Sequence, residues 1–455
     1  METMSPVLNI LKRMEENPSN QDCSAALKDA LASYDLTDLI DGWYELDNKQ
    51  ALTVFLALEQ EDRGELISEL PPGDQQNLVA SLSVEAAKDL FEEMDPDDLV
   101  DLIQSVSPEV RQEVLSHLSP ESLKETEFLL RFDDDDAAGL MTTRYAAIRE
   151  GITVGQAMNF LRKAPENLET VYYIYVVDGL QRLSGVVSLR QLLIHPDNRR
   201  IAEIMERNVV SVRDDTDQEE TARVLEDHSF IALPVTDRWN RLLGIVTFDD
   251  MIDVIREEQT EDVYRMSAIG GEAEEYLESS IPRLIWMRLP WLVLLLLAGT
   301  ITTNVLAGYK SLIGQFSFLA LFIPVITQTG GNTGAQSSTL MIRGLATGHL
   351  HFRLIGRAFL KELATGVAIG IATGLVIFLR SILLPPGVQT TEALSVAVSL
   401  SAVVLFASLL GCLVPFIVDR FGGDPAVAAG PLMSTLIDVA GLTVYFEVSR
   451  LFLAG

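Results

Sequence analysis

Residues 431–446 read PLMSTLIDVAGLTVYF, a run of apolar and small residues with one charged side chain, Asp438, near its middle. Positions 434, 435, 441 and 442 are Ser, Thr, Gly and Leu, so no cation stands one turn away on the same helix. A charge at the centre of a membrane helix costs about 2.5–3.5 kcal/mol even on the lenient insertion scale. We therefore expect Asp438 to face protein or water. It is either a pore carboxylate or the partner of a Ser, Thr or Lys on another helix.

The stretch belongs to an apolar C-terminal part of the chain. After Pro282, five segments are long enough for the roughly 20 residues that cross a bilayer core; they are 286–307, 317–341, 358–380, 394–418 and 426–453. If the N-terminus is inside, the inner flanks carry seven Lys or Arg and the outer flanks carry three. Basic residues favour the cytosolic side. The sequence thus predicts a multi-pass α-helical membrane domain with its C-terminus outside.

Polar residues gather in the second of these segments, where residues 324–342 read PVITQTGGNTGAQSSTLMI. Polar side chains and Gly-rich backbone are tolerated at membrane depth where they are buried or line water. Polar contacts between helices are the alternative interpretation. Together with the carboxylate described above, the segment predicts an ion-conducting pore lined by Asp438, Asn332, Thr333, Gln336, Thr339 and Ser434. Gly366, Gly370 and Gly374 recur at every fourth position of the third segment, which predicts close helix packing.

Charge is distributed very unevenly along the 455 residues. From Leu284 onward the chain holds nine Lys or Arg and six Asp or Glu, whereas the preceding part holds 25 and 59. Such an acidic part repels nucleic acid and attracts cations, so we exclude a nucleic-acid partner. Oxygen ligands without a His or Cys cluster favour Mg²⁺, Ca²⁺ or Mn²⁺, and one pore carboxylate in polar surroundings favours Mg²⁺, which keeps most of its water. No P-loop, HExxH or GxSxG motif indicates an enzyme.

A repeat of 12 residues runs through the acidic part. The segments LPPGD, LSVEA, MDPDD, VSPEV and LSPES begin at residues 70, 82, 94, 106 and 118. Four of them place a proline in the same phase, and Asp95, Ser107 and Ser119 precede three of these prolines as helix N-caps. Each repeat predicts one short helix, and such helices bury their apolar faces by stacking on neighbours. We predict an all-α solenoid over residues 1–132.

A looser repeat follows. The segments RLSGVVSLRQLL and RLLGIVTFDDMI are similar to each other. The strand pattern YYIYVV precedes the first, and IALPV precedes the second. Each copy has the order strand, strand, helix. The two copies resemble a tandem pair of CBS domains, which we assign to residues 133–256. A strongly charged helical pattern continues from this pair, and we assign residues 257–281 to a connecting helix, with a solvated linker as the alternative. Residues 282–455 form the membrane domain.

An acidic helical domain, a CBS pair, a charged connecting helix and membrane segments with GGNTGAQS and STLIDVAGL resemble the MgtE family of magnesium transporters. The resemblance implies a homodimer in the cell inner membrane, with a pore between the subunits, Asp438 as the pore carboxylate and the connecting helix as a plug. It implies that Mg²⁺ bound by cytosolic carboxylates closes the pore. The matching sensor acids are Asp97, Asp101, Asp217, Glu219, Asp250, Asp253, Glu258, Glu261 and Asp262.

The sequence departs from the family pattern at two cytosolic positions. Ser229 stands where an acid is expected, which weakens one metal site between domains. ATP is a candidate ligand of the CBS pair, but Gln191 replaces the acid that nucleotide-binding CBS modules often offer to a ribose. Two other functions stay open from the residues alone: transport of Co²⁺, Mn²⁺ or Ca²⁺, and a membrane sensor that senses cations without conducting them.

Overall fold

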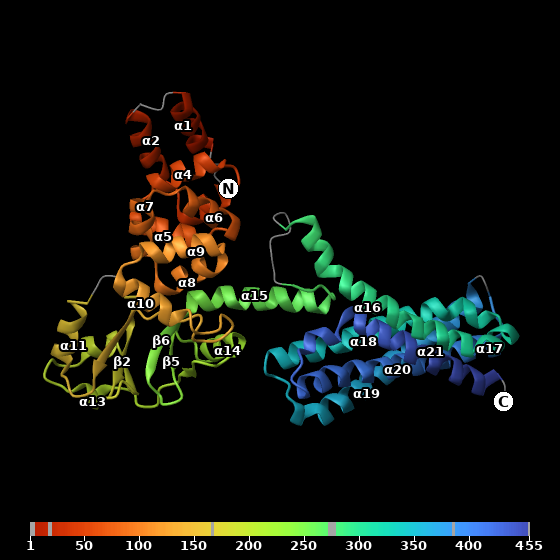
Figure 1. The fold of residues 1–455 in the computed structure, drawn as a ribbon. Coiled ribbons are helices and arrows are strands. Elements are labelled where there is room, and N and C mark those ends of the chain that lie inside the picture. The colour runs from red at the N-terminus through yellow and green to blue at the C-terminus, as the bar shows by residue number, and fades with distance from the viewer. Residues whose placement is uncertain (1–4, 17–20, 165–167, 272–278, 385–386, 454–455) are drawn as a thin grey trace. The chain divides into compact units, whose positions relative to one another are not determined.

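The computed structural model describes residues 5–16, 21–164, 168–271, 279–384 and 387–453. It divides into two compact units, Met1–Ile255 and Arg256–Gly455. The predicted connecting segment 257–281 lies partly outside the described residues. Figure 1 labels the elements of both units, and each unit is described by itself below.

The first unit opens with ten helices within the described residues. They are α1 (Ser5–Glu16), α2 (Gln21–Leu31), α3 (Leu36–Trp43), α4 (Asn48–Ala57), α5 (Gln60–Glu69), α6 (Pro72–Ser81), α7 (Val84–Glu93), α8 (Pro96–Ser105), α9 (Pro108–His117) and α10 (Pro120–Leu129). The last five, of ten residues each, confirm the prediction of one short helix per repeat. Asp95, Ser107 and Ser119 occupy the expected N-cap positions, but only Ser119 accepts a backbone N–H there, from Ser122.

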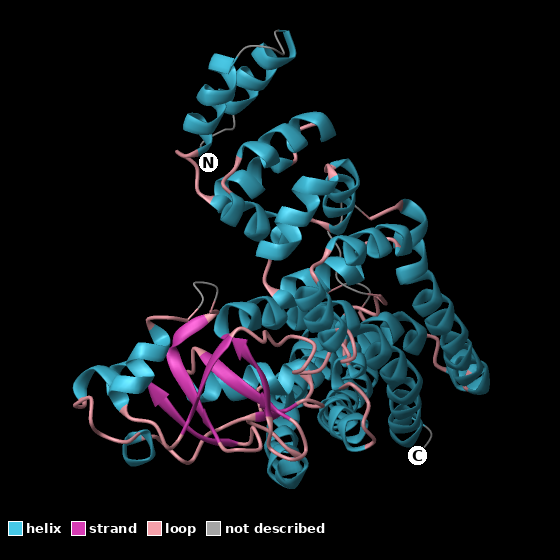
Figure 2. Cartoon of the chain, turned by 60° about the vertical axis from the view of Figure 1, so that its left-hand side comes forward, coloured by secondary structure: helices cyan, strands magenta, loops and turns pink. Residues whose placement is uncertain are grey.

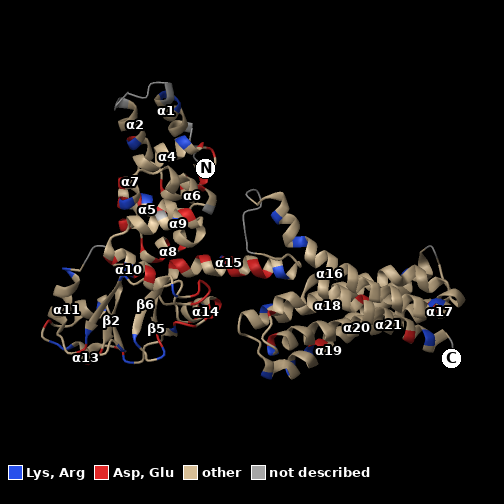
Figure 3. Ribbon diagram, viewed as in Figure 1, with Lys and Arg blue, Asp and Glu red and all other residues tan. Residues whose placement is uncertain are grey.

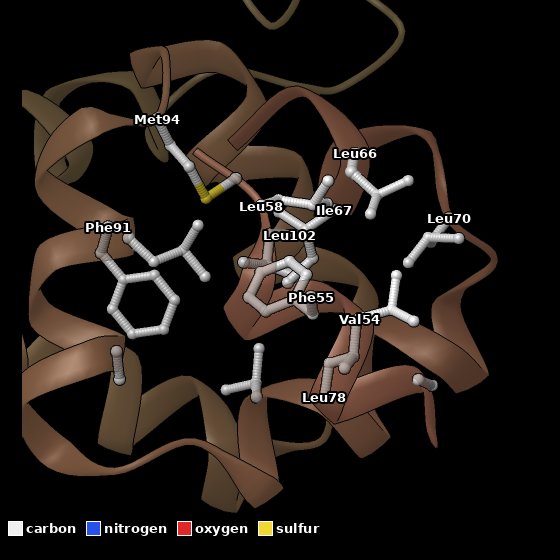
Figure 4. Packing of buried hydrophobic residues seen from close by; sticks show 14 of the residues in the cluster. Val54, Phe55, Leu58, Leu66, Ile67, Leu70, Leu78, Phe91, Met94 and Leu102 are labelled. Carbon is white, nitrogen blue, oxygen red and sulfur yellow. The ribbon is translucent and has the colours of Figure 1, made fainter. Parts of the chain in front are cut away.

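Each repeat helix packs on its second neighbour along the chain, α5 on α7, α7 on α9 and α6 on α8. The buried faces meet in one core, in which Phe55, Leu66, Ile67 and Phe91 are almost completely shielded from solvent (Figure 4). Neighbour-on-neighbour burial is what a repeat of short helices requires, because one ten-residue amphipathic helix is too short to be stable alone. The solenoid shape itself stays a prediction.

The predicted strand–strand–helix modules form two three-stranded sheets, drawn in magenta in Figure 2. The elements are β1 (Tyr145–Arg149), α11 (Val154–Leu161), β2 (Thr170–Val177), β3 (Leu183–Ser188), α12 (Leu189–Ile194), α13 (Ile201–Ile204), β4 (Val212–Arg213), α14 (Gln218–His228), β5 (Ala232–Thr236) and β6 (Leu242–Thr247). In each sheet the first pair of strands is parallel and the second antiparallel, with Ile174 opposite Val187 and Leu233 opposite Val246. The two modules repeat one topology, as the sequence predicts.

Helix α15 (Phe248–Met266) begins directly after β6, within the range assigned to the CBS pair. The second unit then contains α16 (Ile281–Gly308), α17 (Lys310–Gln315), α18 (Phe318–Ala346), η1 (Phe352–Leu354), α19 (Ile355–Leu383), α20 (Thr390–Arg420), η2 (Pro425–Ala428) and α21 (Gly430–Leu453). Acidic residues lie along the length of α15, whereas few charged residues lie along the long helices after it (Figure 3).

Five long helices coincide with the five predicted membrane segments. Three of them, Ile281–Gly308, Phe352–Leu383 and Thr390–Arg420, are apolar and long enough to cross a membrane by length and composition. Helices α18 and α21 are not among these three; α18 carries the polar GGNTGAQSST run, and α21 carries Asp438, Glu447 and Arg450. The apolar character of the domain is confirmed, and the count of five crossings stays a prediction.

The glycine stripe of α19 packs as predicted. A Cβ added at Gly370 would lie 2.9 Å from the carbonyl oxygen of Ser401, and one at Gly366 would lie 3.1 Å from Ser408 Cβ. Helices α19 and α20 make the most extensive helix pair of the domain, and the Ser401 hydroxyl donates to the Gly370 carbonyl at 2.7 Å. Small residues permit this backbone approach, which is how helices associate in lipid.

Candidate ion pathway and cation-sensing acids

Helices α18 and α21 meet along a seam of small residues at the level of the polar segment quoted above. A Cβ at Gly331 would lie 3.4 Å from Ser434 Oγ, and the Ile437 side chain fills the space beside Gly330 and Gly334. Ile437 is fully buried at this contact. The structure therefore places Ser434 of α21 against the Gly-rich run of α18, and Asp438 lies four residues further along α21.

The predicted pore residues of α18 divide between two faces of the helix. Asn332, Gln336 and Thr339 are exposed in the single chain. Thr333 is buried, and its hydroxyl donates to the Thr329 carbonyl one turn earlier, at 2.8 Å. Positions 332, 336 and 339 follow the 3.6-residue period and so share a stripe, from which Thr333 is turned away.

Asp438 is half-buried on α21. Among the residues that the structure describes, it has no hydrogen bond and no ion pair. In this part of the chain, no Ser, Thr or Lys of another helix bonds to Asp438, as the alternative role would require. A lone carboxylate at membrane depth is costly unless water or a cation reaches it. This favours the pore interpretation.

Sequence reasoning missed a second carboxylate, Glu362 of α19. It is 7% exposed, and its Oε2 atom lies 3.0 Å from Ser337 Oγ of α18 and 2.6 Å from Ser408 Oγ of α20. The signal was present: Glu362 precedes Gly366 by four residues and so stands on the same face as the glycine stripe.

Several acids gather in the first unit, where α8 approaches the CBS pair. Burial, reinforced by Asp250, Asp98 and Glu169, raises the pKa of Asp97 well above its usual value. Burial and neighbouring carboxylates raise the pKa of Asp98 to about 7 and that of Glu169 to about 7. The pKa of Asp250 is also raised, chiefly by burial. Asp97 and Asp250 were predicted sensor acids, whereas Asp98 and Glu169 were missed.

Hydrogen bonding leaves this acidic cluster of Asp97, Asp98, Glu169 and Asp250 incompletely satisfied. The Asp97 Oδ1 atom is buried without a hydrogen-bond partner. Arg144 lies beside the cluster, but it pairs with Asp95 and donates to the Met94 carbonyl at 2.9 Å. Thr247 donates to Asp250. A buried carboxylate oxygen without a donor is expensive, and a cation is the natural group to neutralise it.

The remaining predicted sensor acids do not all share one place. Asp217 caps α14 by accepting the Glu219 N–H at 2.9 Å, and it lies beside Asp136. Near it, a hollow of about 470 Å³ is lined by Arg131, Phe132, Asp133, Asp134, Asp136, Asp214 and Asp215. Within the described residues, no group of three or more His, Cys, Asp or Glu has the geometry of a metal site.

The C-terminal end of α15 lies against the start of α21. Arg265 pairs with Glu261 on its own helix and with Asp424, which caps η2 by accepting the Ala426 N–H at 2.7 Å. Burial and the nearby Asp424 raise the pKa of Asp262. Ser338 of α18 donates to the Ala428 carbonyl at 2.7 Å. Arg265, η2 and α18 are thereby linked by consecutive contacts.

Gly430 permits this arrangement. Its φ angle is +36°, and a Cβ there would overlap the carbonyl oxygen of Met266 at the end of α15. An L side chain would therefore be strained and would push the two elements apart.

Family comparisons agree along the chain. Residues 323–448 match a divalent cation transporter family model named MgtE, residues 33–135 match the MgtE intracellular N domain, and residues 137–197 and 201–257 match CBS domains. The magnesium transporter MgtE of Thermus thermophilus is 45% identical over 336 residues, which are 72% of each chain. The chain belongs to the MgtE family.

Other members and solved structures support this assignment. The magnesium transporter MgtE of Enterococcus faecalis is 39% identical over 333 residues, again 72% of each chain. A crystal structure of the cytosolic domain of the Mg²⁺ channel MgtE in complex with ATP is 40% identical, with a TM-score of 0.51, and covers 55% of this chain and 99% of that one. The soluble part of a magnesium transporter matches at 31% identity and a TM-score of 0.50, over 56% and 99%. The predicted acidic N-domain and CBS pair of an MgtE protein are confirmed.

Proposed function

We propose that this chain is a magnesium channel of the cell inner membrane that imports Mg²⁺ down its electrochemical gradient. The proposal is supported by the contact of α18, which carries the polar stripe, with Ser434 and Ile437 of α21, the helix that also carries the carboxylate of Asp438. Hard oxygen groups and a single charge suit a cation that keeps most of its water. The names of the MgtE relatives support magnesium as the cargo.

A homodimer completes the pore in this proposal. The stripe of Asn332, Gln336 and Thr339 is exposed in one chain at membrane depth. Lipid does not satisfy such groups, so a second copy and the water of a pore are the environment that fits them. Two Asp438 carboxylates would then face one ion between them. The proposed membrane domain has five crossings, with the N-terminal domains in the cytosol and the C-terminus outside.

Cytosolic Mg²⁺ closes the channel in this proposal. The fit to a divalent cation rests on the orphaned Oδ1 of Asp97 and on the raised pKa values around it, because carboxylates crowded without a counterion are stabilised when a cation binds. Asp97, Asp98, Glu169 and Asp250 would hold the ion there. The predicted acids Asp101, Asp217, Glu219, Asp253, Glu258, Glu261 and Asp262 stay part of the sensor hypothesis.

Helix α15 transmits this signal as the plug. Its last turn contacts η2 through Arg265 and Asp424, and η2 leads directly into α21, which carries Asp438. A change in the position of α15 therefore acts on the elements that flank the pore helix. Mg²⁺ binding among the acids of the chain lowers their mutual repulsion and favours the closed arrangement.

ATP remains a candidate ligand of the CBS pair, since the similar cytosolic domain was solved in complex with ATP. The Gln191 side chain already forms hydrogen bonds within this chain: it completes the capping box of α12 and donates to the Ile204 carbonyl at 3.1 Å. ATP binding would therefore depend on other side chains of the pair.

The decisive experiment is ion flux in liposomes that contain the purified full chain. Mg²⁺ uptake should exceed uptake of Ca²⁺, Mn²⁺ and Co²⁺, and it should fall when Mg²⁺ is added on the side of the cytosolic domains. Preferred uptake of another cation would change the assigned cargo. Absence of any divalent flux would favour a membrane sensor instead.

A further inference from the structure

Glu362 is a buried carboxylate that the proposed pathway does not use. It lies on α19, between Ser337 of α18 and Ser408 of α20, and both serines are also buried, at 4% and 1% exposure. Within the described residues, no Lys or Arg forms an ion pair with it. The buried thiol of Cys412 also lies near it. Among the described residues, the carboxylate is therefore held by the hydroxyl groups of Ser337 and Ser408.

The hydrogen bonds of this site join three helices at one point. Ser408 Oγ donates to Glu362 Oε2 at 2.6 Å. Ser337 Oγ lies 3.0 Å from the same oxygen and 2.9 Å from the Ser408 carbonyl oxygen, so its one proton serves two acceptors. Each of α18, α19 and α20 contributes one side chain, and each side chain bonds to another helix.

Backbone packing at this level fixes the distance between α18 and α20. A Cβ at Gly411 of α20 would overlap the carbonyl oxygen of Gly334 of α18 and lie 3.0 Å from Ser337 Cβ. Glycines offer a smooth surface, and lipid tails give no hydrophobic preference for one helix face over another. The directional hydrogen bonds of Ser337 then add to the side-chain packing that holds α18 at one rotation about its axis.

The rotation of α18 about its axis determines which of its side chains face the proposed ion pathway. Ser337 is adjacent in sequence to Gln336, and one residue corresponds to about 100° around a helix of 3.6 residues per turn. Holding Ser337 inward therefore holds Asn332, Gln336 and Thr339 on the exposed side. We infer that Glu362 is a positioning residue for ion permeation, which clamps Ser337 and Ser408 and so orients the polar stripe of α18. This inference rests on the proposed channel function.

The test uses the full chain in liposomes and compares Mg²⁺ with Ca²⁺ flux for three variants. Glu362→Gln keeps an oxygen that accepts from both hydroxyls, so flux and the Mg²⁺/Ca²⁺ ratio should stay within about twofold of the parent. Glu362→Leu and the double variant Ser337→Ala/Ser408→Ala remove the clamp and should lower the ratio about tenfold. If the leucine variant does not fold, the double serine variant carries the test.

A matched control is Ser381→Ala. Ser381 is also buried on α19, but its hydroxyl donates at 2.6 Å to Ile377 of its own helix, so its loss should leave the ratio unchanged. A Gln variant that loses flux would show that the charge is needed and that Glu362 binds the cation, which overturns the inference. An unchanged ratio in the variants that remove the clamp would overturn it as well.

A second measurement separates this inference from the proposed function. Asn332→Cys, introduced after replacement of Cys23 and Cys412 by Ser and Ala, is labelled with a membrane-impermeant thiol reagent, with and without Glu362→Leu. The labelling rate should change about tenfold when the clamp is lost, because α18 turns. If the parent chain carries no Mg²⁺ flux, the proposed function fails and this rate still tests the clamp. An unchanged rate would contradict the clamp, whatever the flux.

Discussion

Gly411 of α20 lies so close to Gly334 of α18 that a side chain at position 411 would overlap the carbonyl oxygen of Gly334. A backbone oxygen inside a helix has little freedom to move. Gly411→Ala should therefore separate α18 from α20 and destabilise the membrane domain by about 1–3 kcal/mol, as overpacking does. The measurement is thermal unfolding of the full chain in detergent.

The control for this change is Gly299→Ala on α16. Nothing within the structure lies within 4 Å of a Cβ at Gly299, so alanine there should be neutral or slightly stabilising. Equal melting temperatures for the two alanine variants would show that α18 and α20 are not tightly packed at Gly411.

Asp438 is expected to supply the pore charge. Asp438→Asn keeps size and hydrogen bonding but removes the charge that offsets dehydration of a divalent ion, so Mg²⁺ flux in liposomes should fall at least about tenfold while folding is kept. Glu447→Gln is the matched control on α21, because Glu447 is engaged by Tyr309 at 2.7 Å and Arg450 at 2.6 Å. A stable Asp438→Asn protein that conducts normally would make Asp438 a helix contact instead.

Asp97 and Asp250 are expected to sense Mg²⁺. Asp97→Asn/Asp250→Asn removes two charges from the acidic cluster, which weakens cation binding and should move closure to higher Mg²⁺, with open-channel flux unchanged. The measurement is flux against Mg²⁺ on the cytosolic side. Asp29→Asn/Glu85→Gln removes the same number of charges at exposed positions. If that control shifts the curve as much, total charge rather than this cluster would govern closure.

The raised pKa values of Asp98 and Glu169, both about 7, predict proton release on Mg²⁺ binding. Because these pKa values lie above the ordinary ones, the folded chain binds more protons at these acids than the unfolded chain does between about pH 4 and 7. Without metal, the contribution of these acids to the stability of the folded chain therefore falls as pH rises through that window. Mg²⁺ needs the ionised acids, so binding at pH 7 should release about one proton, and at pH 9 almost none.

This release is measured by calorimetric titration of the full chain with Mg²⁺ in two buffers that differ in ionisation enthalpy. The difference between the two heats gives the number of protons released. Identical heats in both buffers at pH 7 would mean that Mg²⁺ binds away from Asp98 and Glu169.

Arg265 and Asp424 are expected to couple α15 to the pore helix. Arg265→Glu replaces an attractive pair by repulsion from Asp424, Glu261 and Asp262, so closure should require several-fold more Mg²⁺, in keeping with the modest energy of a partly exposed pair. Adding Asp424→Lys restores an opposite-charge pair and should recover part of the shift. A gating curve that is the same in all three proteins would remove this contact from the mechanism.

The sequence alone determined the order of the parts and most helix positions. The 12-residue repeat predicted the helices that begin at Pro72, Pro96, Pro108 and Pro120, and the repeated GVVS and GIVT segments predicted the last strand of each module, β3 and β6. These are periodic or local signals, since helix starts and strand alternation depend on residues close along the chain.

Only the tertiary structure decided which side chains meet. Asp98 and Glu169 lie in the same cluster as Asp97 and Asp250, although no local pattern distinguished them from the other acids of the chain. Glu362 was recognisable by its phase with the glycine stripe, but its partners Ser337 and Ser408 lie on two other helices. Thr333 belongs to the polar run and yet faces the packed side. Which face of a helix is buried depends on the helices packed against it, and the sequence of one segment does not specify which helices those are.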